Sequence, residues 1–138
     1  MAEFEFPIRV YWEDTDAGGI VFYANYLKYF ERARTEWLRS LGIGQRRLRE
    51  RAGGMFVVVN ASIRYRTAAR LDDELVVTAH LQEAGRAALV ISQQAFVQSA
   101  APGRRELLCD ASIRIGWVDA GTLRPARIPQ DILQHLHP

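Results

Sequence analysis

The sequence predicts an α+β domain in which one antiparallel sheet of about five strands curls around a single long helix. Between Asn25 and Leu41, apolar residues recur every three or four positions, which is the period of a helix with one buried face. In five other segments apolar and polar residues alternate, as they do in strands covered on one face. A sheet wrapped over the helix buries the apolar surfaces of both.

The first strand is predicted over residues 4–10, and Pro7 favours an edge position because proline cannot donate to a strand ladder. Four more strands are predicted over residues 57–65, 75–82, 88–98 and 106–118. In the first of these four, the alternation places one row of residues toward the core: Val57, Val59, Ala61, Ile63 and Tyr65. In the last, the row is Leu107, Cys109, Ala111, Ile113, Ile115 and Trp117. The connectors at 70–73, 83–86 and 101–103 carry turn residues, so the last four strands are expected to form an antiparallel meander.

The long helix is expected to start at Asn25, a good capping residue, and to end at Gly42, which adopts the left-handed conformation easily. Glu31 with Arg34 and Arg32 with Glu36 have the spacing of ion pairs on its exposed face. Residues 45–51 are expected to form a short polar helix or turn closed by the glycines at 53 and 54. Residues 130–136 are expected to form an amphipathic tail.

The length of 138 residues fits one domain over residues 1–138, and 49% hydrophobic with 25% charged residues is typical of a soluble globular protein. Eighteen basic against sixteen acidic residues leave no uniform field for nucleic acid. Cys109 is the single cysteine, so an intrachain disulfide and paired-cysteine zinc or redox chemistry are excluded, and it is expected in the core. With no apolar stretch long enough to span a bilayer and no basic leader, the protein is expected in the cytoplasm.

One segment combines acids, glycines and aromatic residues: Glu13 to Tyr26, EDTDAGGIVFYANY. An EF-hand calcium loop starting at Asp14 would have Gly18 and Asn25 where it needs an oxygen ligand and a bidentate glutamate, so calcium is disfavoured. A phosphatase that attacks through an aspartate is also disfavoured because it needs a parallel α/β sheet. No metal site is predicted.

Two interpretations of the acids remain open. In the structural one, Asp14 or Asp16 accepts backbone hydrogen bonds in a turn that Gly18 and Gly19 make possible. In the catalytic one, the acid lies beside the free N–H groups of the helix start, which suit an oxyanion. An acid facing such donors suggests acyl transfer or ester-type hydrolysis without a metal, and the glycines let the backbone approach a substrate closely.

Three blocks, Arg9–Gly42, Ala69–Val77 and Arg124–Pro129, resemble the hotdog-fold acyl-CoA thioesterases, in particular the Tol-Pal-associated and 4-hydroxybenzoyl-CoA branches. The resemblance implies a long helix wrapped by a sheet, edge-to-edge pairing into a homodimer or homotetramer, active sites at the dimer interface and no bound cofactor. It also implies hydrolysis of acyl-CoA, with Asp16 as nucleophile or general base and the backbone amide of Tyr23 polarising the thioester carbonyl. Many Tol-Pal-associated members carry histidine at the position of Tyr23, so the acyl group is left open.

Several other residues are candidates for function, and each also has a possible structural role. Glu31 is the second-choice acid because some hotdog branches use an acid from this helix, and Arg86 is a candidate contact to the nucleotide end of coenzyme A. The arginines between residues 46 and 51 are expected on a solvated face, or against coenzyme A phosphates or an acyl carrier protein. His80 is expected to be exposed, and His135 with His137 lacks a third metal ligand. The alternative function is a noncatalytic hotdog module that binds acyl-CoA or acyl carrier protein.

Overall fold

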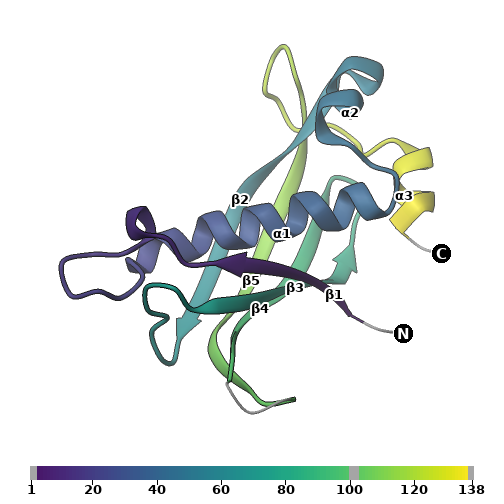
Figure 1. The fold of residues 1–138 in the computed structure, drawn as a ribbon. Coiled ribbons are helices and arrows are strands. Elements are labelled where there is room, and N and C mark those ends of the chain that lie inside the picture. The colour runs from purple at the N-terminus through teal and green to yellow at the C-terminus, as the bar shows by residue number, and fades with distance from the viewer. Residues whose placement is uncertain (1–2, 100–102, 137–138) are drawn as a thin grey trace.

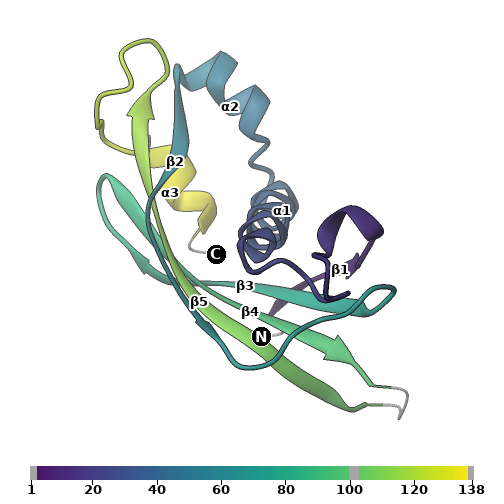
Figure 2. The same ribbon diagram turned by 90° about the vertical axis from the view of Figure 1, so that its left-hand side faces the viewer.

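A computed structural model describes residues 3–99 and 103–136, and it confirms the predicted α+β architecture: an antiparallel sheet curves around one long helix (Figures 1 and 2). The strands are β1 (Phe4–Arg9), β2 (Gly54–Tyr65), β3 (Glu74–Ala84), β4 (Ala88–Gln98) and β5 (Arg105–Asp119). The helices are α1 (Tyr26–Ser40), α2 (Gln45–Ala52) and α3 (Gln130–Leu136), with 3₁₀ turns η1 (Trp12–Asp14) and η2 (Tyr23–Asn25). In Figure 2, α1 is seen nearly end-on inside the concave face of the sheet.

The strand order is β1-β3-β4-β5-β2, so the prediction of a meander over the last four strands is wrong for β2. β3, β4 and β5 do form a meander, but β2 pairs with β5, and β3 pairs with β1. The turn residues that suggested a hairpin between β2 and β3 are used elsewhere: Arg70 forms a bridge to Ile20, and the Asp73 carbonyl accepts the Val10 N–H at 3.0 Å. The edge position predicted from Pro7 is confirmed, because β1 pairs with β3 alone among the described strands.

The predicted core row of β5 is confirmed except at one bulge, whereas the predicted core row of β2 is wrong over most of the strand, where Val59, Ala61 and Tyr65 are exposed. Along β5 a register shift places Leu108, not Leu107, in the core. Along β2 a shift between Val58 and Asn60 and the edge position leave Val59 56% exposed and Tyr65 45% exposed. The outer half of β2 is therefore not covered by the described part of this chain.

Helix α1 follows η2 directly, so the expected capping role of Asn25 is wrong. Asn25 has helical dihedral angles, and its side chain donates instead to the Asp14 carbonyl at 2.8 Å. The predicted end is confirmed: Gly42 has φ +83°, and the Ile43 N–H reaches back to the Leu38 carbonyl at 2.9 Å, closing the helix in a Schellman-type turn.

The predicted ion pairs of α1 are not formed. Arg34 is buried and donates to the Gln93 side chain at 3.0 Å, while Glu36 pairs with Arg39. Gln93 lies in the buried row of β4 and donates to the Phe30 and Thr78 carbonyls at 3.0 and 3.1 Å. The sequence pattern did not distinguish this satisfied core polar group.

Cys109 is fully buried, as predicted, and burial raises the pKa of its thiol to about 12. His80 is exposed, as predicted, and His135 is exposed with its ring nitrogen 2.7 Å from the Asp131 carbonyl; His137 lies outside the described residues. Over residues 3–99 and 103–136, no helix has the length and apolar character needed to cross a bilayer.

Candidate active site

The acid–glycine segment folds into a small hairpin that stands immediately before α1. Thr15 and Val21 form an antiparallel bridge, the Asp16 N–H donates to the Ile20 carbonyl at 2.9 Å, and Gly19 turns the chain with φ +78°. The hairpin is tied to the β2–β3 connection, because the Val21 N–H donates to the Ala69 carbonyl at 2.8 Å. The position of Asp16 is thus set by local turn geometry and by one distant segment.

Asp16 is exposed, and its carboxylate Oδ1 accepts the Gly18 N–H at 2.8 Å. This bond is the one expected of a turn-forming aspartate, so the structural interpretation applies to one of its two carboxylate oxygens. The other oxygen accepts no hydrogen bond from the part of the chain that the structure describes. A Cβ added at Gly18 would lie 3.3 Å from Oδ1, so glycine leaves room for the carboxylate.

The start of the helix lies directly after the hairpin. Phe22 is extended, and Tyr23 is the first residue of η2, so the N–H groups of Tyr23 and Ala24 point out of the helix end. Neither amide donates to an acceptor within residues 3–99 and 103–136. Two donors that suit an oxyanion therefore adjoin the turn that carries Asp16.

Aromatic side chains surround this helix start. Tyr65, at the end of β2, donates from its hydroxyl to the Tyr23 carbonyl at 2.9 Å, and the two rings meet edge-on with centroids 6.2 Å apart. Phe22 and Tyr26 add further ring contacts, and the Tyr26 hydroxyl accepts the Ala69 N–H at 3.0 Å. The phenyl and phenol faces at 22, 23 and 65 are largely exposed, which gives this end of α1 an apolar surface.

The sequence leaves Asp14 and Asp16 as alternatives, whereas the structure gives the two acids different environments. Asp14 is 7% exposed, and its Oδ2 accepts the Tyr11 N–H at 2.9 Å. Tyr29, at the end of the first turn of α1, is fully buried near it. Burial and then the Asp14 charge raise the pKa of the Tyr29 hydroxyl. Neither Tyr29 nor Tyr65 was predicted to belong to the site, because their contacts to it span 15 and 42 positions of sequence.

Glu31, the second-choice acid, lies in the second turn of α1 and is exposed. Its Oε1 accepts the Thr35 hydroxyl at 3.3 Å. It lines a cavity of about 140 Å³ between α1 and the sheet, together with Arg34, Thr35, Leu38, Gln45, Phe56, Val58 and Ile115. Glu31 is therefore separate from the Asp16 turn and adjoins the uncovered edge at Val58.

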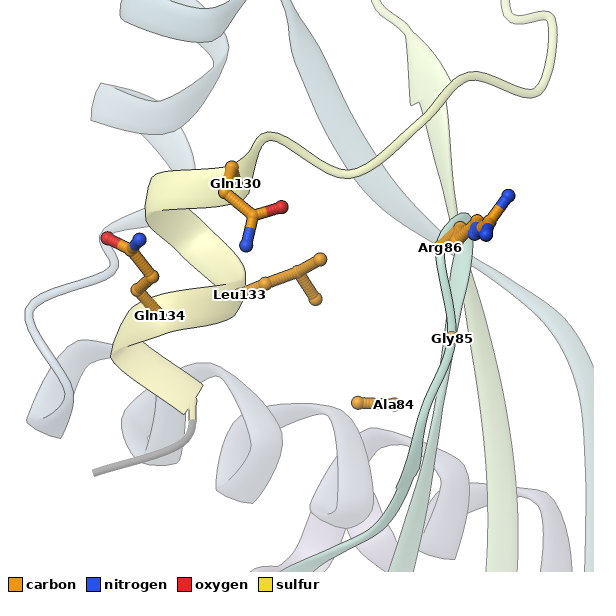
Figure 3. A pocket seen from close by; sticks show the side chains of 6 residues that line it. All are labelled: Ala84, Gly85, Arg86, Gln130, Leu133 and Gln134. Carbon is orange, nitrogen blue, oxygen red and sulfur yellow. The ribbon is translucent and has the colours of Figure 1, made fainter.

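Arg86 lies far from the Asp16 turn within this chain. It occupies the β3–β4 turn beside a recess of about 480 Å³ lined by Ala84, Gly85, Gln130, Leu133 and Gln134. Figure 3 shows its guanidinium directed away from the α3 side chains. α3 packs near the C-terminal end of α1, where it lines a groove with Gly42 and Ile43, whereas Asp16 precedes the N-terminal end (Figure 1). The Arg86 side chain forms no ion pair or hydrogen bond with the described residues, which leaves it available to an anion.

The candidate residues thus form one compact group and two outlying positions. Asp16, Gly18, Gly19 and the Tyr23 amide are contiguous at the N-terminal end of α1, and Glu31 and Arg86 lie apart. An exposed carboxylate beside unpaired amides can accept a proton or attack a carbonyl carbon while the amides stabilise negative charge on oxygen. Within residues 3–99 and 103–136, no three His, Cys, Asp or Glu side chains are grouped as metal ligands.

A comparison with known protein families identifies the family of this chain. The family described as the thioesterase-like superfamily matches residues 10–136, which include every candidate residue. The chain belongs to the thioesterase-like superfamily. Its sheet and long helix are those of the hotdog fold, which confirms the resemblance seen in the sequence.

Curated relatives of this superfamily member match it over nearly their full length. The acyl-CoA thioesterase YbgC of Haemophilus influenzae is 40% identical, with 97% of this chain and 94% of the relative covered. The acyl-CoA thioester hydrolase YbgC of Escherichia coli O157:H7 is 37% identical, with 94% and 92% covered.

Solved structures of other proteins have a similar fold. A hypothetical protein from Aquifex aeolicus is 31% identical with a TM-score of 0.83, covering 96% of this chain and 98% of its own. The 4-hydroxybenzoyl-CoA thioesterase of Pseudomonas sp. strain CBS-3 superposes with a TM-score of 0.87 over 97% of this chain and 99% of its own, at 22% identity, a likeness of fold.

Proposed function

We propose that this protein hydrolyses acyl-CoA thioesters to a free carboxylic acid and coenzyme A. The observation that carries the proposal is the exposed Asp16 carboxylate on the glycine turn that adjoins the unpaired Tyr23 amide. The activity named for the Haemophilus and Escherichia relatives supports the same reaction class.

In one form of the mechanism Asp16 is the general base. Its carboxylate takes a proton from water as the water oxygen attacks the thioester carbon, and the Tyr23 N–H donates to the developing oxyanion. The tetrahedral intermediate then expels the thiolate of coenzyme A, and the thiolate takes the proton from Asp16. In the other form Asp16 is the nucleophile: its oxygen displaces the thiolate, and water cleaves the resulting mixed anhydride.

We also propose that two copies pair through β2. The strand pairs with β5 on one side, and on its other side the described residues offer no partner strand. Val58 and Val59 are 51% and 56% exposed there, and an uncovered apolar edge strand is a template for strand addition. Two such edges meeting would extend the sheet across a twofold axis and cover the outer half of β2. A homotetramer would then form from two of these dimers.

The test of the activity is release of coenzyme A thiol from short-chain, long-chain and aromatic acyl-CoAs. We expect thiol release from at least one of them, and we expect Asp16→Asn to lower kcat about 100-fold while leaving the melting temperature nearly unchanged. Asp131→Asn is the matched control, because Asp131 is also an exposed aspartate, lies on α3 and should keep full turnover.

Two outcomes would overturn the proposal. Full turnover by Asp16→Asn would remove this carboxylate from the mechanism. Saturable binding of acyl-CoA or acyl carrier protein without any thiol release would assign the protein to the noncatalytic alternative. Oligomeric state is tested separately by light scattering, where Val59→Asp should convert a dimer to monomers by placing charges opposite each other at the proposed seam.

A further inference from the structure

Asp14 is the one acid among residues 3–99 and 103–136 that is buried, and the proposed reaction does not use it. A carboxylate removed from water is costly unless hydrogen bonds compensate it. Hydrogen bonds must therefore offset the cost of burying Asp14 two residues before Asp16, and the partners in these bonds indicate its role.

Asp14 holds both ends of the segment that carries Asp16. On the near side its Oδ2 accepts the Tyr11 N–H at 2.9 Å. On the far side the Asp14 main-chain carbonyl, which every variant at this position keeps, accepts the Phe22 N–H at 3.0 Å and the Asn25 side-chain amide at 2.8 Å. The hairpin between these contacts is consequently fastened to the first residues of the helix.

Tyr29 supplies a second contact from within the helix. Its side chain is fully buried, and its hydroxyl is the one buried side-chain polar atom of the described residues that has no hydrogen-bond partner. The Asp14 carboxylate lies near enough to add to the rise in the pKa of this hydroxyl, so the phenol stays protonated beside an acceptor. A buried hydroxyl without a hydrogen-bond partner costs stability, and the Asp14 carboxylate is the nearby acceptor that could receive its proton in a hydrogen bond.

We propose that Asp14, with Tyr29 as donor to its carboxylate, is a positioning residue that fixes the separation between the Asp16 carboxylate and the Tyr23 amide. The proposal rests on the proposed thioesterase function. Because the acid comes from the hairpin and the amide from the helix, their separation depends on the contacts that join the two elements. A misplacement of about 1 Å in such a pair can reduce turnover about 100-fold without abolishing substrate binding.

The first experiment compares kcat and KM for Asp14→Asn, Asp14→Ala and Tyr29→Phe. Asparagine keeps the size and an oxygen acceptor for the Tyr11 N–H, and phenylalanine removes one hydroxyl only. We expect kcat to fall roughly tenfold in Asp14→Asn and Tyr29→Phe and further in Asp14→Ala, with KM within about twofold of the parent. Glu13→Gln is the control, because it neutralises an exposed acid at the adjacent position and should change neither constant.

The second experiment repeats Asp14→Asn and Tyr29→Phe in an Asp16→Asn background. A residue that acts through Asp16 adds little further loss once Asp16 is neutral, whereas a residue that only stabilises the fold lowers turnover equally in both backgrounds. The melting temperatures of all variants are also measured. If Asp14→Ala does not fold, the kinetics of Asp14→Asn and Tyr29→Phe alone test the proposal.

The outcomes separate the two proposals. Full turnover by Asp16→Asn overturns the thioesterase mechanism and the role of Asp14 with it. An inactive Asp16→Asn together with Asp14 and Tyr29 variants that keep kcat within about twofold overturns the positioning role alone. Losses that are the same in both backgrounds, or that follow the fraction unfolded, also overturn it.

Discussion

The Tyr65 hydroxyl at the end of β2 donates to the Tyr23 carbonyl at the start of the helix, with 2.9 Å between the oxygens. This bond joins the uncovered edge strand to the residue whose amide is the proposed oxyanion donor. We therefore expect a change at this edge of the sheet to affect the candidate active site.

Tyr65→Phe is therefore expected to lower kcat about threefold to tenfold while costing about 1 kcal/mol of stability or less, the ordinary worth of one partly exposed hydrogen bond. The measurements are steady-state kinetics and denaturant unfolding. Tyr11→Phe is a suitable control, since Tyr11 is 63% exposed and lies next to β1, not on β2. Unchanged kcat in Tyr65→Phe would show that the bond does not hold the helix start in place for catalysis.

Gly19 and Gly103 give a matched pair for testing the catalytic turn. Both have positive φ, +78° and +77°, and a Cβ added at either meets nothing within 4 Å. Alanine should cost each about 1 kcal/mol through backbone strain alone. We expect Gly19→Ala to lower turnover at least tenfold and Gly103→Ala to leave it intact. Equal effects on kcat would remove the Asp16 turn from the reaction.

The architecture could be predicted because it rests on periodicity. The helical stripe of α1 and the alternation in β3, β4 and β5 are dictated by burial of one face, and burial leaves its mark on every residue of such an element. β2 could not be placed in this way. Its alternation resembles that of a central strand, yet Val59 and Tyr65 are exposed, because pairing order depends on long-range contacts that leave no periodic signal.

The candidate site was predictable to the extent that it is contiguous. Asp16, the glycines and the helix start follow one another in the sequence, so their neighbourhood follows from chain connectivity. The residues that contact this segment from elsewhere could not be predicted in this way, because Tyr29 and Tyr65 reach it only after the helix has packed on the sheet. Asn25 is a residue type that often caps helices. Here it is the last residue of the 3₁₀ turn Tyr23–Asn25, so the helical segment starts at Tyr23 and the Asn25 side-chain amide donates to the Asp14 main-chain carbonyl.

Arg86 is predicted to bind the phosphates of coenzyme A from an adjacent subunit, because its side chain is exposed and unpaired among the described residues and lies at the end of α1 remote from Asp16. Arg86→Ala should raise KM about tenfold with kcat unchanged, and the difference should shrink at high salt. Arg104→Ala is the control, because Arg104 is also an exposed arginine and directly precedes β5. A lowered kcat with unaltered KM would contradict a role in binding the nucleotide.

Cys109 is predicted to be inert in the folded protein, because its thiol is fully buried and burial raises its pKa to about 12. At pH 8 the native protein should not react with Ellman's reagent, while one thiol per chain should react after unfolding in guanidinium.

The pKa of the Cys109 thiol in the folded protein lies above the ordinary value of 9.0, so the unfolded chain gives up this proton first as pH rises. The stability contributed by the neutral thiol is full below pH 9 and is lost as pH rises toward 12. The free energy of unfolding should therefore decline over this window, and Cys109→Ala should make the decline shallower. Rapid labelling of the native protein at pH 8 would contradict the buried, protonated state.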